Sequence, residues 1–140
     1  MRELLFKGKR KDNGEWVEGD YSYSVTEDKH YIICDLEVYS MSEEENDLYA
    51  TEWYEVIPES VFEFVGLTDK NNVKIFEGAI VKLFLDDGIE LGVIRYSEIS
   101  CRFVFYENNT TGYGFDNTCI FEIIGNIYDN PELLGEVING

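Results

Sequence analysis

The chain has 140 residues, of which 44% are hydrophobic and 15% aromatic, and its formal net charge is -18. This length suits one domain or two small ones that share a core, and the apolar content excludes a fully disordered chain. No run approaches the roughly 20 apolar residues of a membrane-spanning helix, and the start lacks the pattern of a secretory signal. We therefore expect a soluble, cytoplasmic protein with no membrane partner.

Alternation of apolar and polar residues predicts β-strands throughout the first 60 residues. A strand over residues 3–9 is followed by Asn13-Gly14, which tolerates positive φ and is therefore a strong hairpin signal. Further strands are expected over residues 15–25, 30–39 and 48–57. The segment SMSEEEND at residues 40–47 interrupts the alternation with charges and turn formers. There we expect an exposed loop or one weak helical turn.

From residue 61 onward, short strands follow at spacings of about 8–12 residues, as in a small barrel or sandwich. They are expected over residues 61–67, 73–78, 79–85, 89–97, 101–107 and 118–128. The sequence DNPELLGEV predicts a short C-terminal helix, because Asn130 can cap it and Pro131 suits its first turn. Leu133 and Leu134 would pack this helix against the strands.

The predicted domain organisation follows from these elements. Residues 1–60 form an N-terminal β-rich segment, and residues 61–140 form a small barrel with the C-terminal helix. The two parts can also pack as one unit. The fold class is therefore mainly β.

Two stretches of the chain repeat one pattern. FKGKRKDNGEWVEGD at residues 6–20 is similar to FVGLTDKNNVKIFEGA at residues 64–79, with Phe, Gly, Asn and Glu-Gly at matching positions. Each copy predicts a strand, a polar turn and a return strand that bends at its glycine. Two copies are too few for a solenoid, which needs at least three. We interpret the repeat as a shared hairpin device or an old duplication.

These two stretches, together with FEIIGNIYDNPELL at residues 121–134, resemble the YopX family in order and spacing. The resemblance covers nearly the whole chain. It implies a phage or prophage protein of a low-GC Gram-positive bacterium, and most members of that family carry no assigned function. It also implies that the C-terminal barrel is of the SH3-like type and follows an N-terminal β-rich segment.

The chain departs from the usual family pattern at two positions of the second copy. Asn72 stands where Gly is usual, but Asn also adopts positive φ, so the turn is preserved. Ala79 stands where Asp is usual, so a reaction that needs an acid there cannot run in this copy. Asp20 keeps that acid in the first copy.

Few residues could carry catalysis. His30 is the only histidine, so a zinc site built on a histidine pair is excluded. The three cysteines lie in apolar strand contexts that would bury a thiol and raise its pKa; they are Cys34, Cys101 and Cys119. A Cys–His dyad would need one of them beside His30.

The acidic cluster of Glu43, Glu44, Glu45 and Asp47 could hold a divalent cation only weakly. It lacks the spaced oxygen ligands and the glycine of a dedicated calcium loop. We therefore expect no enzyme activity, no catalytic, cofactor-binding or metal-binding residues, and no cofactor.

Three binding hypotheses remain. In the first, the chain is a non-catalytic accessory protein that binds an unknown host or phage protein, with Trp16 and Trp53 as candidate anchors and self-association as a further expectation.

In the second, residues 21–70, with thirteen acidic and two basic residues, imitate DNA and inhibit a host DNA-binding protein. The same acidity can serve solubility alone.

The third hypothesis is a nucleic-acid-binding module. The basic tract consists of Lys7, Lys9, Arg10 and Lys11, and strand alternation would put its three lysines on one face. The net charge of -18 repels phosphates and makes a nucleic acid the least favoured partner.

Overall fold

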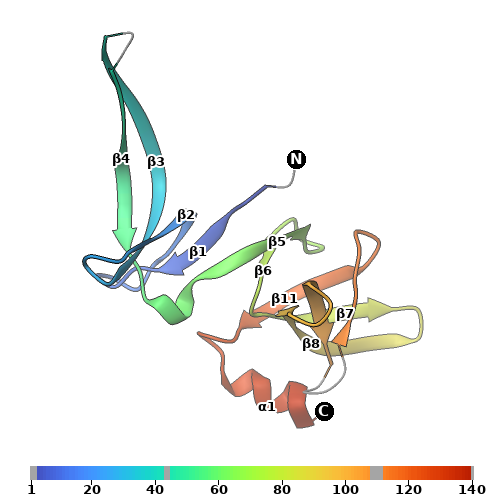
Figure 1. Cartoon of the computed structure of the whole chain (residues 1–140). Helices are drawn as coiled ribbons and strands as arrows, with labels where there is room; N and C mark the ends of the chain where they lie inside the picture. Colours follow the sequence, from blue (N-terminus) through green and yellow to red (C-terminus); the bar gives the residue numbers. More distant parts are fainter. Residues whose placement is uncertain (1–2, 43–44, 108–111, 140) are drawn as a thin grey trace. The chain divides into compact units, whose positions relative to one another are not determined.

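The computed structural model describes residues 3–42, 45–107 and 112–139 and is built almost entirely from antiparallel strands (Figure 1). The strands are β1 (Phe6–Lys9), β2 (Trp16–Ser24), β3 (Lys29–Ser42), β4 (Glu45–Glu55), β5 (Phe62–Thr68), β6 (Lys74–Phe76), β7 (Ala79–Leu85), β8 (Gly88–Ser97), β9 (Arg102–Tyr106), β10 (Gly112–Tyr113) and β11 (Ile120–Asn126). One 3-10 turn, η1 (Pro58–Ser60), and one helix, α1 (Glu132–Asn139), complete the chain. The mainly-β prediction with a short C-terminal helix is confirmed. Among the described helices, neither has the length and apolar composition needed to cross a membrane.

The chain divides into two compact units, residues 3–63 and residues 64–140. In the N-terminal unit the strand order is β4-β3-β2-β1-β5, and β5 pairs with β1 through its first residues. The later residues of β5 pair with β6 in the C-terminal unit. The other sheet of that unit has the order β10-β9-β8-β7-β11.

The C-terminal unit, where we expected a small SH3-like barrel, is not a closed barrel. Within the described ranges no ladder joins β10 to β11, so the five-stranded sheet is open. The outer strand β10 has only two residues, and it lies next to a segment, residues 108–111, that the structure does not describe. The fold is thus a small β-rich unit with two sheet edges.

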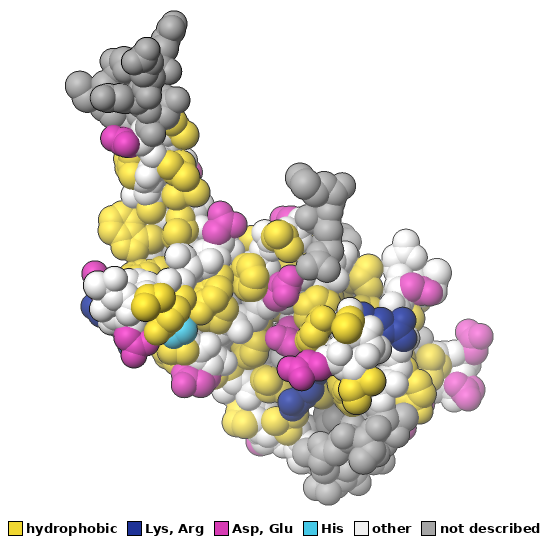
Figure 2. All heavy atoms as spheres, viewed as in Figure 1, with side chains coloured by type: hydrophobic (Ala, Val, Ile, Leu, Met, Phe, Trp, Pro, Cys, Tyr) yellow, Lys and Arg dark blue, Asp and Glu magenta, His cyan; other side chains and the backbone are white. Residues whose placement is uncertain are grey.

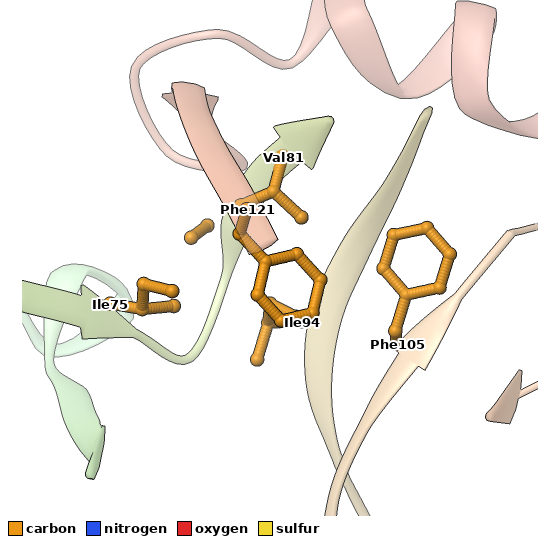
Figure 3. Close-up of a cluster of buried hydrophobic side chains, with 6 residues drawn as sticks. Ile75, Val81, Ile94, Phe105 and Phe121 are labelled. Atoms are coloured by element: carbon orange, nitrogen blue, oxygen red, sulfur yellow. The ribbon is translucent and has the colours of Figure 1, made fainter. Parts of the chain in front are cut away.

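Side chains on both faces of this sheet hold the C-terminal unit together. One face carries a buried cluster of Ile75, Ala79, Val81, Ile94, Phe105 and Phe121 (Figure 3). On the other face, Ile80 and Val93 pack with Leu133 of α1. Neighbours along a strand point to opposite faces, which explains why Ile80 and Val81 enter different clusters. The expectation that Leu133 packs the helix against the strands is confirmed.

The carboxylate of Asp69 ties the turn between β5 and β6 to β11. Its Oδ1 accepts hydrogen bonds from the N–H groups of Asn71 and Val73 at 2.8 and 3.0 Å, and its Oδ2 accepts one from Ile123 at 3.1 Å. The residue is only 6% exposed. Burial opposes ionisation, but the three backbone donors outweigh it, and the pKa of Asp69 lies below its ordinary value.

The two repeated stretches share their turns but use their glycines differently. Gly14 and Asn72 both have positive φ, 74° and 63°, so both predicted turns are confirmed. Gly78 has φ 85° in the turn that joins β6 to β7. Its counterpart Gly19 lies inside β2, where an added Cβ would be 2.2 Å from the carbonyl oxygen of Ile33. The same residue type therefore serves a turn in one copy and a close strand approach in the other.

The prediction of a loop or a weak helical turn at residues 40–47 is wrong for most of this segment. β3 continues to Ser42 and β4 begins at Glu45, with Ser40 opposite Asn46 in the ladder. A two-stranded ribbon is open to water on both faces, so charged residues do not oppose its pairing. Residues 43–44 lie outside the described part of the chain.

The substitution Asp69→Asn tests the tie between the β5–β6 turn and β11. An amide nitrogen would replace one acceptor oxygen and leave a buried N–H without its partner, so we expect a loss of about 1–3 kcal/mol in the free energy of unfolding at pH 7. Urea denaturation measures this loss. Asp87→Asn in the exposed β7–β8 turn is the control and should change stability little.

The same carboxylate gives a pH dependence with a defined sign. The folded carboxyl keeps its charge at pH values where the unfolded carboxyl, with an ordinary pKa of 3.8, takes up a proton. Its contribution is complete above that ordinary value and is lost as the pH falls through the lower folded pKa. The stability difference between the wild type and Asp69→Asn should therefore be smaller at pH 3 than at pH 7. An equal difference at both pH values would contradict the assignment.

Candidate binding surface on the N-terminal sheet

The sheet of the N-terminal unit has one packed face and one face open to water. On the packed face, Ile32 and Val56 are fully buried, and a Cβ added to Gly8 would lie 3.0 Å from Val56. The backbone N–H of Lys9 donates to the Oγ of Ser60, which is also buried. Strand alternation places Trp53 on the opposite face, where it is 52% exposed.

Burial is unequal between the two units. Among the described residues, the buried hydrophobic side chains of the N-terminal unit are Ile32, Val56 and Phe62. The C-terminal unit has eleven, namely Phe64, Ile75, Phe76, Ala79, Ile80, Val81, Val93, Ile94, Val104, Phe105 and Phe121. The N-terminal unit therefore leaves much of its apolar surface to the solvent.

Trp53 lines two shallow hollows. The larger has a volume of about 390 Å³ and is lined by residues of β2, β3 and β4, among them Tyr31, Ile33 and Ala50. The smaller, about 310 Å³, lies between Trp53 and Lys11. An exposed indole beside such hollows is typical of an anchor at a protein interface.

β3 and β4 continue past β2 as a two-stranded ribbon, which we define as residues 35–42 and 45–52 (Figure 1). β2 pairs with β3 only over Lys29–Ile33, whereas β4 stays paired with β3 out to Ser42. A two-stranded ribbon has no second layer of its own to cover either face.

One face of the ribbon is apolar. Leu36 lies opposite Ala50, and Val38 lies opposite Leu48. Leu36 is 41% exposed, and Val38 and Leu48 are each 65% exposed. Because Ala50 also lines the larger hollow, this face is continuous with the surface around Trp53. We call the combined surface the apolar strip; it consists of Ile33, Leu36, Val38, Leu48, Ala50 and Trp53, and Figure 2 shows hydrophobic side chains along the ribbon.

The other face of the ribbon is acidic. Asp35 lies opposite Glu52, and Glu37 lies opposite Tyr49, whose hydroxyl donates to the Glu37 carboxylate at 3.3 Å. The register puts Asp47 on the same face, two residues before Tyr49. The ribbon is therefore amphipathic, with apolar and acidic side chains separated by strand alternation.

Two residues of the basic tract lie over an aromatic ring. The ammonium groups of Lys7 and Lys9 are 4.6 and 5.6 Å from the ring centroid of Trp16. Both lysines therefore share one face of β1, as strand alternation predicts. Cation–π contact with Trp16 holds these ammonium groups against the sheet.

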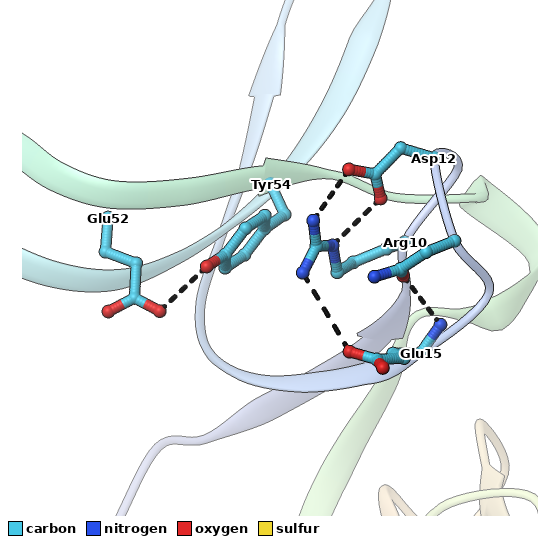
Figure 4. Close-up of polar contacts among 6 residues, drawn as sticks. Arg10, Asp12, Glu15, Glu52 and Tyr54 are labelled. Atoms are coloured by element: carbon cyan, nitrogen blue, oxygen red, sulfur yellow. Dashed lines mark hydrogen bonds and ion pairs between the residues drawn. The ribbon is translucent and has the colours of Figure 1, made fainter.

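The other two residues of the tract are paired with acids. The guanidinium of Arg10 donates two hydrogen bonds to Asp12, at 2.9 and 2.6 Å, and stacks 3.9 Å from the ring centroid of Tyr54 (Figure 4). The hydrogen bond from Arg10 lowers the pKa of Asp12. Lys11 forms a 2.9 Å ion pair with Glu55. Half of the predicted phosphate-binding tract thus has acidic partners within the chain.

His30 is part of an aromatic stack. Its Nδ1 lies 2.6 Å from the hydroxyl of Tyr21, and its ring stacks on Tyr21 and Tyr23 with centroid distances of 5.8 and 4.6 Å. The stack joins β2 and β3, because Tyr23 lies directly opposite His30 in the ladder. These contacts indicate that His30 has a structural role in the sheet.

The cysteines follow the prediction only in part. Cys34 is half-buried, and burial raises the pKa of its thiol, as expected. Cys119 is half-buried against the cluster around Phe121. Cys101 is exposed in the turn between β8 and β9 with φ 54°, so the expectation of burial is wrong there. Its apolar neighbours favoured a buried position within a strand, but the residue lies in a turn, where its side chain is exposed.

The acidic cluster considered as a cation site falls largely outside the described residues. This applies to Glu43 and Glu44, and the side chain of Glu45 is not described either. In the part of the chain that the structure does describe, no three His, Cys, Asp or Glu side chains come together as a metal site.

The Arg10 contacts predict unequal effects for two neighbouring substitutions. Arg10→Gln removes the paired hydrogen bonds to Asp12 and the stacking on Tyr54, from a side chain that is 19% exposed. Lys11→Gln removes one ion pair of a side chain that is 53% exposed and screened by water. Thermal unfolding should show a larger fall in midpoint for Arg10→Gln. Equal midpoints for the two variants would contradict a structural role for Arg10.

Comparison with solved structures supports the fold. The chain is similar to the crystal structure of protein EF1440 from Enterococcus faecalis, with a TM-score of 0.65 and 22% sequence identity. The similarity covers 96% of this chain and 99% of the other. No curated protein matches the sequence. The YopX family, described as "YopX protein", matches residues 5–135, and this match over most of the chain shows that the chain belongs to the YopX family.

Proposed function

We propose that this chain is a phage or prophage accessory protein that binds another protein in the cytoplasm of the bacterial host and catalyses no reaction. The observation that carries the proposal is Trp53, half exposed beside two hollows and continuous with the rest of the apolar strip. Membership of the YopX family supports the phage or prophage origin.

The energetics of burial support a binding role for the apolar strip. Single exposed hydrophobic residues are common on protein surfaces, but contiguous exposed patches mark interaction sites or aggregation hazards. Here Leu36, Val38 and Leu48 are contiguous with Trp53 on one sheet face. A partner that covers this face would remove its apolar area from water and rigidify the ribbon.

The acidic face of the ribbon favours a second candidate, an inhibitor that occupies a host DNA-binding protein by imitating DNA. Residues 35–55 contain no Lys or Arg and eight acids: Asp35, Glu37, Glu43, Glu44, Glu45, Asp47, Glu52 and Glu55. Binding of this kind depends on charge, so moderate salt should release the partner. A partner held through the apolar strip should remain bound in the same salt.

Nucleic-acid binding through residues 7–11 is the third candidate. This candidate has the least support, because two of the four basic residues are already paired with acids. Arg10 pairs with Asp12, and Lys11 pairs with Glu55. Retardation of DNA or RNA at physiological salt, abolished when Lys7 and Lys9 are changed to Ala, would favour it over protein binding.

The substitution Trp53→Ala tests the proposed function. The tagged protein is incubated with host lysate, cross-linked, and the captured proteins are quantified by mass spectrometry. We expect Trp53→Ala to lose a specific protein at least tenfold while the free energy of unfolding changes by about 0.5 kcal/mol or less.

Tyr113→Ala is the matched control, because Tyr113 is an aromatic residue of the C-terminal unit that is 49% exposed. This variant should capture the same protein as the wild type. Equal capture by Trp53→Ala would contradict the proposal. Self-association is a separate expectation, and native mass measurement at high concentration tests it.

A further inference from the structure

We propose that β4 is a docking edge for an extended segment of the partner protein, in which hydrophobic residues alternate with Lys or Arg. The inference rests on the proposed function and names the chemistry of the partner. The segment would add a strand beside β4. Its hydrophobic side chains would extend the apolar strip, and its basic side chains would extend the acidic face.

The strand order gives β4 an open side. It is the outermost strand of the N-terminal sheet, and among the described residues its ladder is with β3 alone. At its end, the carbonyl of Glu55 already accepts a hydrogen bond from the backbone N–H of Lys11 at 3.0 Å, so the open edge is residues 45–54. Such an edge presents backbone N–H and C=O groups that an incoming strand can pair with. With eleven residues, Glu45–Glu55, it is longer than the other outermost strands of the two sheets, β6, β10 and β11, which have three, two and seven.

Alternation along the outer half of β4 defines the pattern of the incoming segment. Over residues 47–50, Leu48 and Ala50 belong to the apolar strip, whereas Asp47 and Tyr49 lie on the acidic face. The register shifts on both sides of the Asp35–Glu52 pair interrupt this alternation, and Trp53 returns to the apolar strip. An added strand would place its own side chains alternately beside these two faces. One face would then bury hydrophobic groups together, and the other would bring cations next to carboxylates.

Charge selects the occupant. A second copy paired along β4 would bring Asp47, Glu52 and Glu55 close to the same acids of its neighbour, on a chain of net charge -18. Like charges directly opposed across a strand pair are destabilising. Two residues of the chain's own basic tract are already engaged, because Lys11 pairs with Glu55 and Arg10 with Asp12. A basic segment of a different protein fits the edge best.

Synthetic ten-residue peptides test this inference with the full chain. The first peptide alternates Lys and Val, the second has the same composition in two blocks, and the third alternates Glu and Val. A fourth repeats the first with N-methyl groups on every second residue, which removes donors for strand pairing. Fluorescence anisotropy of labelled peptides measures affinity. We expect the alternating Lys and Val peptide to bind at least tenfold more tightly than each of the other three.

Substitutions in the protein locate the site. Leu48→Lys should weaken binding of the Lys and Val peptide at least tenfold, because it puts a cation in the apolar strip. Ile89→Lys on β8 is the matched control, 59% exposed, and should bind as the wild type does. A double variant with Glu37→Lys and Asp47→Lys should bind the Glu and Val peptide more tightly than the wild type does.

Three results would overturn the inference. The first is that the alternating Lys and Val peptide fails to bind, or binds no better than the block or N-methylated peptide. The second is that Leu48→Lys and Ile89→Lys weaken binding equally. The third is that the wild type forms a dimer that Leu48→Lys dissociates, which would make a second copy the occupant. In each case, capture of a specific protein that depends on Trp53 would leave the proposed function standing, so the two failures are distinguishable.

Discussion

β3 and β4 remain hydrogen-bonded to each other well past Ile33, the last residue of β3 that β2 reaches. This difference in strand length is the constraint from which the properties of the N-terminal unit follow. In a ribbon of two strands, at most half of the backbone N–H and C=O groups form hydrogen bonds between the strands, and neither face can be buried against the ribbon itself. Because side chains alternate, the hydrophobic residues of the ribbon gather on one face and stay exposed there.

The C-terminal unit, in contrast, buries the hydrophobic side chains on its sheet faces. Its five-stranded sheet is covered on both faces, by the cluster around Phe121 on one side and by the packing of Leu133 of α1 on the other. Asp69 adds a polar tie that joins the β5–β6 turn to β11. Ala79 lies in the apolar cluster, so a carboxylate at this position would be surrounded by hydrophobic side chains.

Charge and burial act together on the open sheet face. The cations of the basic tract are held by Trp16, Tyr54, Asp12 and Glu55, so they strengthen the sheet near its turns. The acids of the ribbon lie on the face opposite its exposed hydrophobic residues. Acidity keeps such a surface soluble and disfavours pairing of identical edges, while it leaves the edge open to a basic strand.

The sequence by itself determined most of the strands, the turns at Asn13-Gly14 and Asn71-Asn72, the C-terminal helix and the family, because alternation, turn chemistry and short motifs are local signals. It also named Trp16 and Trp53 as candidate anchors, of which the structure leaves Trp53 exposed and Trp16 half-buried. Only the tertiary structure decided that Cys101 is exposed, that Arg10 stacks on Tyr54, and that residues 40–42 and 45–47 extend a ribbon. These depend on register and on which strand ends first, since partners such as Leu36 and Ala50 meet across the sheet through pairing that no local pattern encodes.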